Sequence, residues 1–179
     1  MANVNAPNGF TPAYHMSGGV IRPSEFAIAS ATAASIFSGD VVILSSGLVI
    51  QGTATGAPLG VFYGVEYQAT DGSVVFSKMW TAATATLGAA NAKAYVYVDP
   101  DIVYEAQSTG TPTQASVGTT YTISTTAGDT NTGRSKEGVT ATTSSGIATV
   151  VGFVERPDNA IAQYARMNVI FPTSAFGNN

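Results

Sequence analysis

The sequence predicts an all-β fold, a barrel- or sandwich-like domain of short antiparallel strands preceded by an extended N-terminal arm. Short runs rich in Val, Ile, Tyr and Phe, which favour strands, recur at roughly ten-residue spacing. Gly, Pro, Asn and Asp separate these runs, as in the turns of antiparallel sheets. Helical periodicity is not sustained over any long segment. At 179 residues the chain is long enough to bury a hydrophobic core.

The arm is expected to span residues 1–24 and the β-rich domain residues 25–179. Pro and Gly punctuate the arm, and Pro fixes φ and lacks a backbone donor, so a helix is not expected there. The arm also carries apolar side chains that need a surface to lie against. We expect it to dock on a neighbouring subunit or on an assembled lattice; the alternative is that it folds back on its own domain. The expected contact residues are Phe10, Tyr14, Met16, Ile21 and Arg22.

The first half of the domain contains a clear hairpin. Residues 25–38 are rich in Ala and Ser and are expected to be extended or irregular. Residues 41–44 and 48–50 then form two strands around a Ser-Ser-Gly turn. The next strand is expected at residues 60–67, where internal Gly residues indicate a bulge or a sharp bend. A further strand pattern begins after the Asp71-Gly72 turn and runs on to Trp80.

The second half continues the same pattern of short strands and turns. Its expected strands are residues 94–98, 102–106, 121–123, 147–154 and 165–171. We expect a loop over residues 125–137, one helical turn over residues 160–164 and a tail from residue 172.

The low charge of the chain favours a protein that works inside an assembly. Charged residues are 10% of the sequence, against about 25% in ordinary soluble proteins. The net charge is −4, and no two of the seven Lys and Arg residues are adjacent. Nucleic acids and anionic membranes attract clustered positive charge, so neither is an expected partner. We also expect no membrane-spanning segment and no signal peptide, because the chain has no long apolar run and its first ten residues lack a charged and an apolar region.

Candidate catalytic groups are scarce. The sequence has no Cys and a single His, His15, which lies in the expected arm, and it contains none of the common hydrolase, phosphate-binding or zinc motifs. Asp99, Asp101 and Glu105 are the closest group of carboxylates, for which a calcium site is weighed against a solvated turn. We expect the solvated turn, and therefore no catalytic activity, no metal and no cofactor. The Tyr residues of the strands are interpreted as packing residues rather than a sugar-stacking platform.

Several segments, taken in order, carry a family resemblance. They are residues 2–12, 17–19, 21–22, 38–42, 58–67, 76–78, 95–100, 133–135 and 152–159, followed by a final apolar strand. Together they are similar to the capsid decoration (cement) proteins of tailed bacteriophages, particularly marine ones. The resemblance covers most of the chain, and the order of the segments is more specific than any single segment.

The resemblance implies a β-barrel-like virion protein on the outer capsid surface, commonly a trimer, whose partner is the major capsid protein. Such a subunit binds only the assembled lattice and stabilises it by mass action. The family has no catalytic signature, so the resemblance assigns no active-site residues. Two alternatives stay open: another virion part, such as a tail-tube or head-fibre subunit, and a carbohydrate-binding β module with exposed aromatic residues beside carboxylates.

Overall fold

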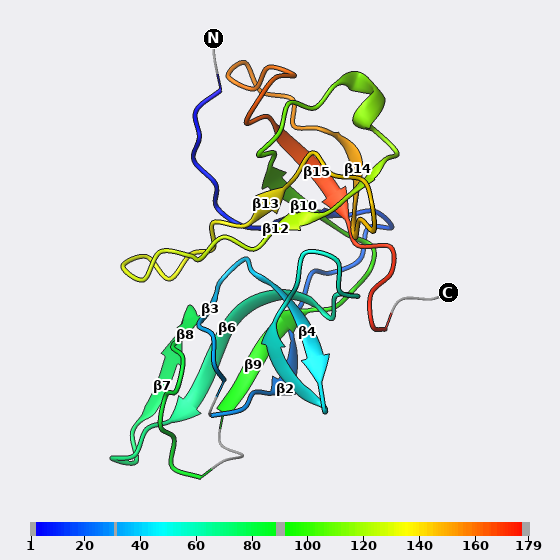
Figure 1. The fold of residues 1–179 in the computed structure, drawn as a ribbon. Helices are drawn as coiled ribbons and strands as arrows, with labels where there is room; N and C mark the ends of the chain where they lie inside the picture. Colours follow the sequence, from blue (N-terminus) through cyan, green and yellow to red (C-terminus); the bar gives the residue numbers. More distant parts are fainter. Residues whose placement is uncertain (1–2, 31, 89–91, 177–179) are drawn as a thin grey trace.

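The chain is nearly all β in a computed structural model that describes residues 3–30, 32–88 and 92–176. The described residues contain one short 3-10 helix, η1 (Gln114–Ser116), and no α-helix. The prediction of an all-β fold is therefore confirmed. No helix in this part of the chain is long and apolar enough to cross a membrane. The strands form two lobes, one above the other in Figure 1.

The terminal lobe combines the beginning of the chain with its second half. Its antiparallel sheet has the order β1-β10-β15-β14-β11, and a two-stranded ribbon, β12-β13, accompanies it. The strands are β1 (Thr11–His15), β10 (Ile102–Gln107), β15 (Arg166–Ile170), β14 (Ala148–Phe153), β11 (Thr120–Tyr121), β12 (Ile123–Ser124) and β13 (Gly138–Val139). Tyr104, Met167 and Phe171 lie in its core together with Phe10.

The inner lobe is built from the segment between these two parts and is barrel-like. Its sheet has the order β2-β9-β6-β4-β5, with β7 paired to β6, and the ribbon β3-β8 accompanies it. A bridge between Ile28 and Val49 joins the region after β2 to β5, so the sheet curls almost to closure. The strands are β2 (Ser24–Ala27), β3 (Ile36–Phe37), β4 (Val41–Ser45), β5 (Leu48–Gln51), β6 (Gly60–Gln68), β7 (Val74–Ser77), β8 (Met79–Trp80) and β9 (Ala92–Tyr97).

The inner lobe has a separate hydrophobic core, which includes Phe62, Val65, Val96 and Trp80. Along β9, buried Ala92, Ala94 and Val96 alternate with more exposed residues, as the period of two in a strand requires. The buried indole N–H of Trp80 donates a hydrogen bond of 2.6 Å to the Thr32 hydroxyl. The alternation along β9 leaves Tyr95 and Tyr97 on the outer face of this lobe.

The expected hairpin is present as β4 and β5. Its turn places Ser46 and Gly47 at φ of 51° and 80°, the left-handed region that such a two-residue turn uses. Most of the other expected strands also form, with ends that differ by a few residues. The pattern that runs to Trp80 is divided between β7 and β8, and residues 121–123 are divided between β11 and β12, each pair in different sheets. The expected helical turn over residues 160–164 is wrong, because these residues are bends and turns.

The N-terminal segment differs from the expected extended arm that docks on a neighbouring subunit. Residues 11–15 form β1, an edge strand paired with β10, and residues 24–27 form β2, paired with β9. Because the chain passes from the terminal lobe to the inner lobe over residues 16–23 and returns over residues 98–101, both lobes contain part of residues 1–27. The described arm thus folds onto its own chain, which was the alternative to docking on a neighbour.

Candidate functional site

A groove of about 390 Å³ at the boundary of the lobes combines polar, aromatic and cationic residues and is here called the aromatic groove. It collects residues from β1, β6, β7 and β9 and from four segments outside these strands. The lining residues are Asn8, Phe10, Thr11, Pro12, Ser38, Gly39, Val61, Phe62, Tyr63, Phe76, Lys78, Tyr97 and Arg134. None of them is Asp or Glu, so the groove has aromatic and cationic character.

A β-bulge places Tyr63 at the groove. In the pairing of β6 with β9, Phe62 lies opposite Val96 and Gly64 lies opposite Tyr95, which leaves Tyr63 as the extra residue. Phe62 is fully buried, whereas Tyr63 is 44% exposed. The glycine pattern of this strand predicted a bulge, and the bulge is what turns Tyr63 outward.

Gly64 makes room for a second aromatic ring. A Cβ atom at this position would lie 2.9 Å from the Ser77 carbonyl oxygen and 3.3 Å from the Phe76 ring. The absence of a side chain therefore lets Phe76 of β7 lie over the outer face of β6. Phe76 is 56% exposed, so its ring contributes little to the core of the inner lobe.

Four aromatic residues form a continuous strip on this outer face. Tyr63 contacts Phe76 and Tyr97 with ring centroids 6.3 and 5.6 Å apart, and Phe76 contacts Tyr95 at 5.8 Å. Burial of its hydroxyl, and after that the proximity of Tyr63, raises the pKa of Tyr97. These four residues are called the aromatic strip below. The sequence favours a packing role for these tyrosines, and only the pairing register shows that they share an outer face.

Two cations lie at the edge of the strip. Lys78 and Arg134 both line the groove and are exposed. The Arg134 guanidinium donates a hydrogen bond of 3.3 Å to the Asn8 side-chain oxygen, and no carboxylate pairs with either cation in the described residues. The groove therefore has an uncompensated positive edge in a chain whose net charge is −4.

The structure separates the five predicted contact residues. Phe10 is 1% exposed and packs edge-on against Phe171 in the terminal core. It is thus unavailable to a neighbouring subunit in this conformation. Ile21 is partly buried against the same core, whereas Tyr14, Met16 and Arg22 are exposed. Only the latter three remain free to contact a partner.

Beneath the groove, two carboxyl groups are buried in the joint between the lobes. Asp40 and Glu137 are both fully buried. The Phe37 N–H donates to Asp40 Oδ2 and the Val41 N–H donates to Glu137 Oε2, each at 2.8 Å. Asp40 Oδ1 and Glu137 Oε1 have no hydrogen-bond partner. Sequence analysis missed this pair because 97 positions separate its members.

Burial determines the protonation of this pair. Removal from water raises the pKa of Asp40 to about 6, against the lowering effect of hydrogen bonds from Ser135 and Phe37. Burial, followed by repulsion from Asp40, raises the pKa of Glu137 well above its usual value. Two neighbouring buried carboxylates cannot both be charged without a large penalty, so the pair retains a proton at neutral pH.

A second polar cluster, with exposed carboxylates around the largely buried His15 side chain, joins the two crossovers. The His15 Nε2 atom lies 3.0 Å from Asp99 Oδ2, and the Ser17 Oγ atom lies 3.1 Å from both His15 Nδ1 and Asp101 Oδ2. The hydrogen bond from His15 is the main cause that lowers the pKa of Asp99, with a further contribution from the Asp101 N–H. Glu105 lies outside this cluster, where it accepts hydrogen bonds from Arg156 and Arg166.

The cluster has the connectivity of a Ser-His-Asp system but a different electrostatic setting. Ser17 Oγ also donates to the carboxylate of Asp101, which competes with His15 for the hydroxyl proton. The negative charge of that carboxylate would also repel the oxyanion of a tetrahedral intermediate formed on Ser17. Ligand atoms of His15, Asp99 and Asp101 lie within 4.8 Å of one another, a spacing that a metal ion could bridge. Hydrogen bonds already use these atoms, so the cluster acts as a tie between residues 15–17 and 99–101.

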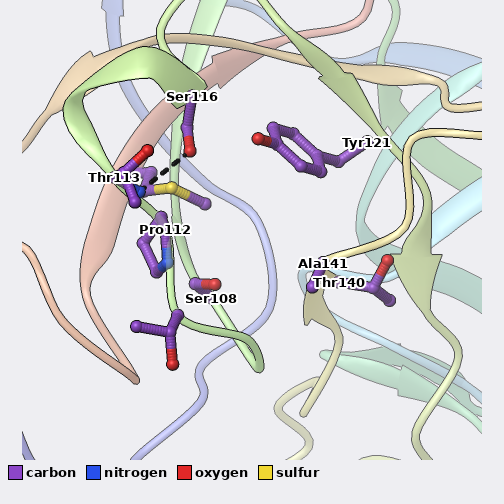
Figure 2. Close-up of a pocket in the computed structure, with 9 residues that line it drawn as sticks. Ser108, Pro112, Thr113, Ser116, Tyr121, Thr140 and Ala141 are labelled. Atoms are coloured by element: carbon purple, nitrogen blue, oxygen red, sulfur yellow. Dashed lines mark hydrogen bonds between the residues drawn. The ribbon is translucent and has the colours of Figure 1, made fainter.

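A smaller pocket of about 150 Å³ lies in the terminal lobe (Figure 2). Ser108, Pro112, Thr113, Ser116, Tyr121, Thr140, Ala141 and Met167 are among its lining residues. The Thr113 N–H donates to the Ser116 hydroxyl at 3.0 Å, and the Tyr121 hydroxyl points toward Ser116 from across the pocket (Figure 2). The pocket has no acidic or basic side chain, so it provides no acid–base pair.

Comparison with known proteins identifies no relative of the chain. No protein family, curated protein or solved structure matches it. The similarity to phage decoration proteins therefore stays a prediction from the sequence.

Proposed function

We propose that the chain is a non-enzymatic structural subunit that binds the outer surface of a bacteriophage capsid and stabilises the shell. The observation that carries the proposal is the aromatic strip, four contacting rings on the outside of a barrel-like lobe that has a complete core of its own. The strip lies outside the core of its own lobe. Tyr97 packs against the terminal core, and Tyr63 and Phe76 are about half exposed and free to contact a partner.

The composition of the strip fits a protein–protein contact. Aromatic residues are enriched in the buried centres of interfaces, and contiguous exposed apolar patches mark interaction surfaces. Tyr63 and Phe76 are about half exposed, so a partner that covers them gains hydrophobic burial without unfolding this chain. The exposed Tyr14 and Met16 of the N-terminal segment add a second apolar surface.

The acidic balance of the chain and its few, dispersed cations suit the outer rather than the DNA-facing side of a shell. Self-association, most simply as a trimer, accords with the low surface charge and with the family resemblance. A subunit that binds only assembled lattice stabilises that lattice by mass action.

The carbohydrate-binding alternative has weaker support. It requires exposed aromatic residues beside carboxylates, whereas Trp80 is fully buried and the aromatic groove is lined by neither Asp nor Glu. Glu66, the carboxylate nearest the strip along β6, accepts a hydrogen bond of 3.0 Å from the Tyr95 hydroxyl. A tail-tube or head-fibre subunit is distinguished by its assembly, because it would form rings or fibres without a preformed shell.

The test uses empty shells assembled from the major capsid protein of the same genome. Purified full-length chain is added to the shells, and binding is measured by cosedimentation and located by electron microscopy. We expect saturable binding at defined outer lattice positions and a higher disruption temperature of the shells. Binding to unassembled capsid protein alone, or rings formed without shells, would contradict the proposal.

The absence of catalysis is tested separately on the cluster at the crossovers. We expect no hydrolysis of activated esters above the rate of the Ser17→Ala variant. Ester hydrolysis that Ser17→Ala and His15→Gln both abolish would show that the cluster is an active site.

A further inference from the structure

We propose that the aromatic groove binds an extended acidic segment of the shell subunit, with an apolar or aromatic side chain on the strip and carboxylates at Lys78 and Arg134. This inference rests on the proposed function and deepens it, because it names the chemistry of the partner.

The distribution of unpaired cations singles out the groove. The chain has seven Lys and Arg residues, all within the described residues. Four of them pair with carboxylates: Lys93 with Glu25, Lys136 with Asp129, and both Arg156 and Arg166 with Glu105. Of the three described cations that form no ion pair, Arg22, Lys78 and Arg134, the last two line this one groove.

The two cations are held on neighbouring segments. A Cβ atom at Gly133 would lie 3.1 Å from Lys78 Cβ, so the segment before Arg134 runs directly beside Lys78. Arg134 is oriented further by its hydrogen bond to Asn8. A ligand with carboxylates can therefore reach both cations from one side, and charge-assisted hydrogen bonds to them would be stronger than neutral ones.

The floor and the size of the groove fit a short polypeptide segment. Tyr63, Phe76 and Tyr97 provide ring faces and edges against which an aromatic side chain can pack. The volume of about 390 Å³ is that of a small-ligand site, enough for a few side chains and too small for a folded domain. An acidic polysaccharide shares the negative charge, but sugar recognition also needs acceptors for hydroxyl groups. The groove has no carboxylate, and its Asn8 oxygen already accepts from Arg134.

The first experiment measures the groove without the capsid. The probe is a fluorescent random copolymer of Glu and Tyr, compared with a Lys and Tyr copolymer and with a heparin fragment. The test variant is Lys78→Gln/Arg134→Gln. Its matched control is Lys93→Gln/Lys136→Gln, which removes the same charge from exposed residues outside the groove. We expect the wild type and the control to bind the Glu/Tyr copolymer, and the test variant to bind it about tenfold more weakly.

The outcomes of this experiment separate the possible occupants. Loss of binding in Phe76→Ser, whose side chain is more than half exposed, would support contact of the probe with the strip. Equal binding of the Lys/Tyr copolymer, or an unchanged affinity of the test variant, would overturn the inference. Binding of heparin but not of the Glu/Tyr copolymer would overturn it in favour of an acidic glycan.

The second experiment separates this inference from the proposed function. The same variants are added to the preformed shells. If the wild type and the Lys78→Gln/Arg134→Gln variant bind shells equally, the chain is a shell-binding protein but its groove does not receive an acidic segment. If the wild type binds the Glu/Tyr copolymer through the groove but binds no shell, the groove does bind acidic segments. The proposal that the partner is a capsid subunit is then wrong.

Discussion

The two polar connections between the lobes differ in burial, and this difference governs how each responds to pH and mutation. At the joint, Asp40 and Glu137 are fully buried and each has one oxygen without a partner. At the crossovers, Ser17, Asp99 and Asp101 are exposed and bond to the His15 side chain or to one another, and that side chain is 7% exposed. Because water cannot compensate a buried charge, the same types of group are expected to have large effects at the joint and small effects at the crossovers.

The largest effect is expected from a matched pair of glycine substitutions, one in each connection. Gly9 and Gly18 both have positive φ, 66° and 77°. A Cβ atom at Gly9 would lie 2.5 Å from Ser135 Cβ and 2.7 Å from the Gly39 carbonyl oxygen, whereas one at Gly18 would have no neighbour within 4 Å. We expect Gly18→Ala to lower the free energy of unfolding by about 1–2 kcal/mol, the cost of the left-handed conformation.

Gly9→Ala adds the clash in the joint to that same conformational cost. We expect a total loss of about 3–5 kcal/mol, measured by chemical denaturation of both variants. Equal losses in the two variants would show that the joint is loosely packed and would break the comparison.

A smaller but more diagnostic effect concerns the proton of the buried pair. The pKa of Asp40 is raised from 3.8 to about 6 and that of Glu137 is raised from 4.5, so the folded state holds protons more tightly than the unfolded state. The resulting stabilisation is complete below about pH 4 and is lost as the pH rises through 6 and above. For Asp40 alone, the rise in pKa from 3.8 to about 6 corresponds to a change in the free energy of unfolding on the order of 3 kcal/mol between low and high pH.

Glu137→Gln isolates this effect from the other carboxylates of the chain. The amide can still accept the hydrogen bond from the Val41 N–H and provides a permanent donor for Asp40. We expect this variant to be less stable than the wild type or equal to it near pH 4 and more stable at pH 8. Parallel stability curves for the two proteins from pH 4 to 8 would contradict a shared proton. The exposed Asp71→Asn variant serves as the control for a carboxylate outside the joint.

The smallest effect is expected at the crossover cluster. The hydrogen bond from His15 lowers the pKa of Asp99, so its contribution is present above about pH 4 and is lost as the pH falls through the lowered pKa. The Asp99 side chain is 45% exposed, so Asp99→Asn is expected to cost only about 0.5–1 kcal/mol at pH 7. The loss should shrink in 1 M salt, measured by denaturation at two salt concentrations. A loss above that of Gly9→Ala would reverse the comparison.

The sequence by itself determined the secondary structure well where local chemistry decides it. The strand expected at residues 94–98 and the Ser-Ser-Gly turn are local features. Both are present, the strand as β9 (Ala92–Tyr97). The bulge at Tyr63 was also indicated by neighbouring glycines. The helical turn over residues 160–164 was wrong because a five-residue helix depends on tertiary contacts for its stability.

Tertiary structure alone decided which distant residues meet. Phe10 was assigned to a partner because the apolar side chains of the expected arm need a surface to lie against. In the structure residues 11–15 pair with the edge of β10, and this pairing draws Phe10 into the terminal core. The aromatic strip and the Asp40–Glu137 pair likewise join segments far apart in the chain. Strand register brings such residues together through long-range backbone hydrogen bonds, and composition and periodicity describe only what lies within a few residues of each position.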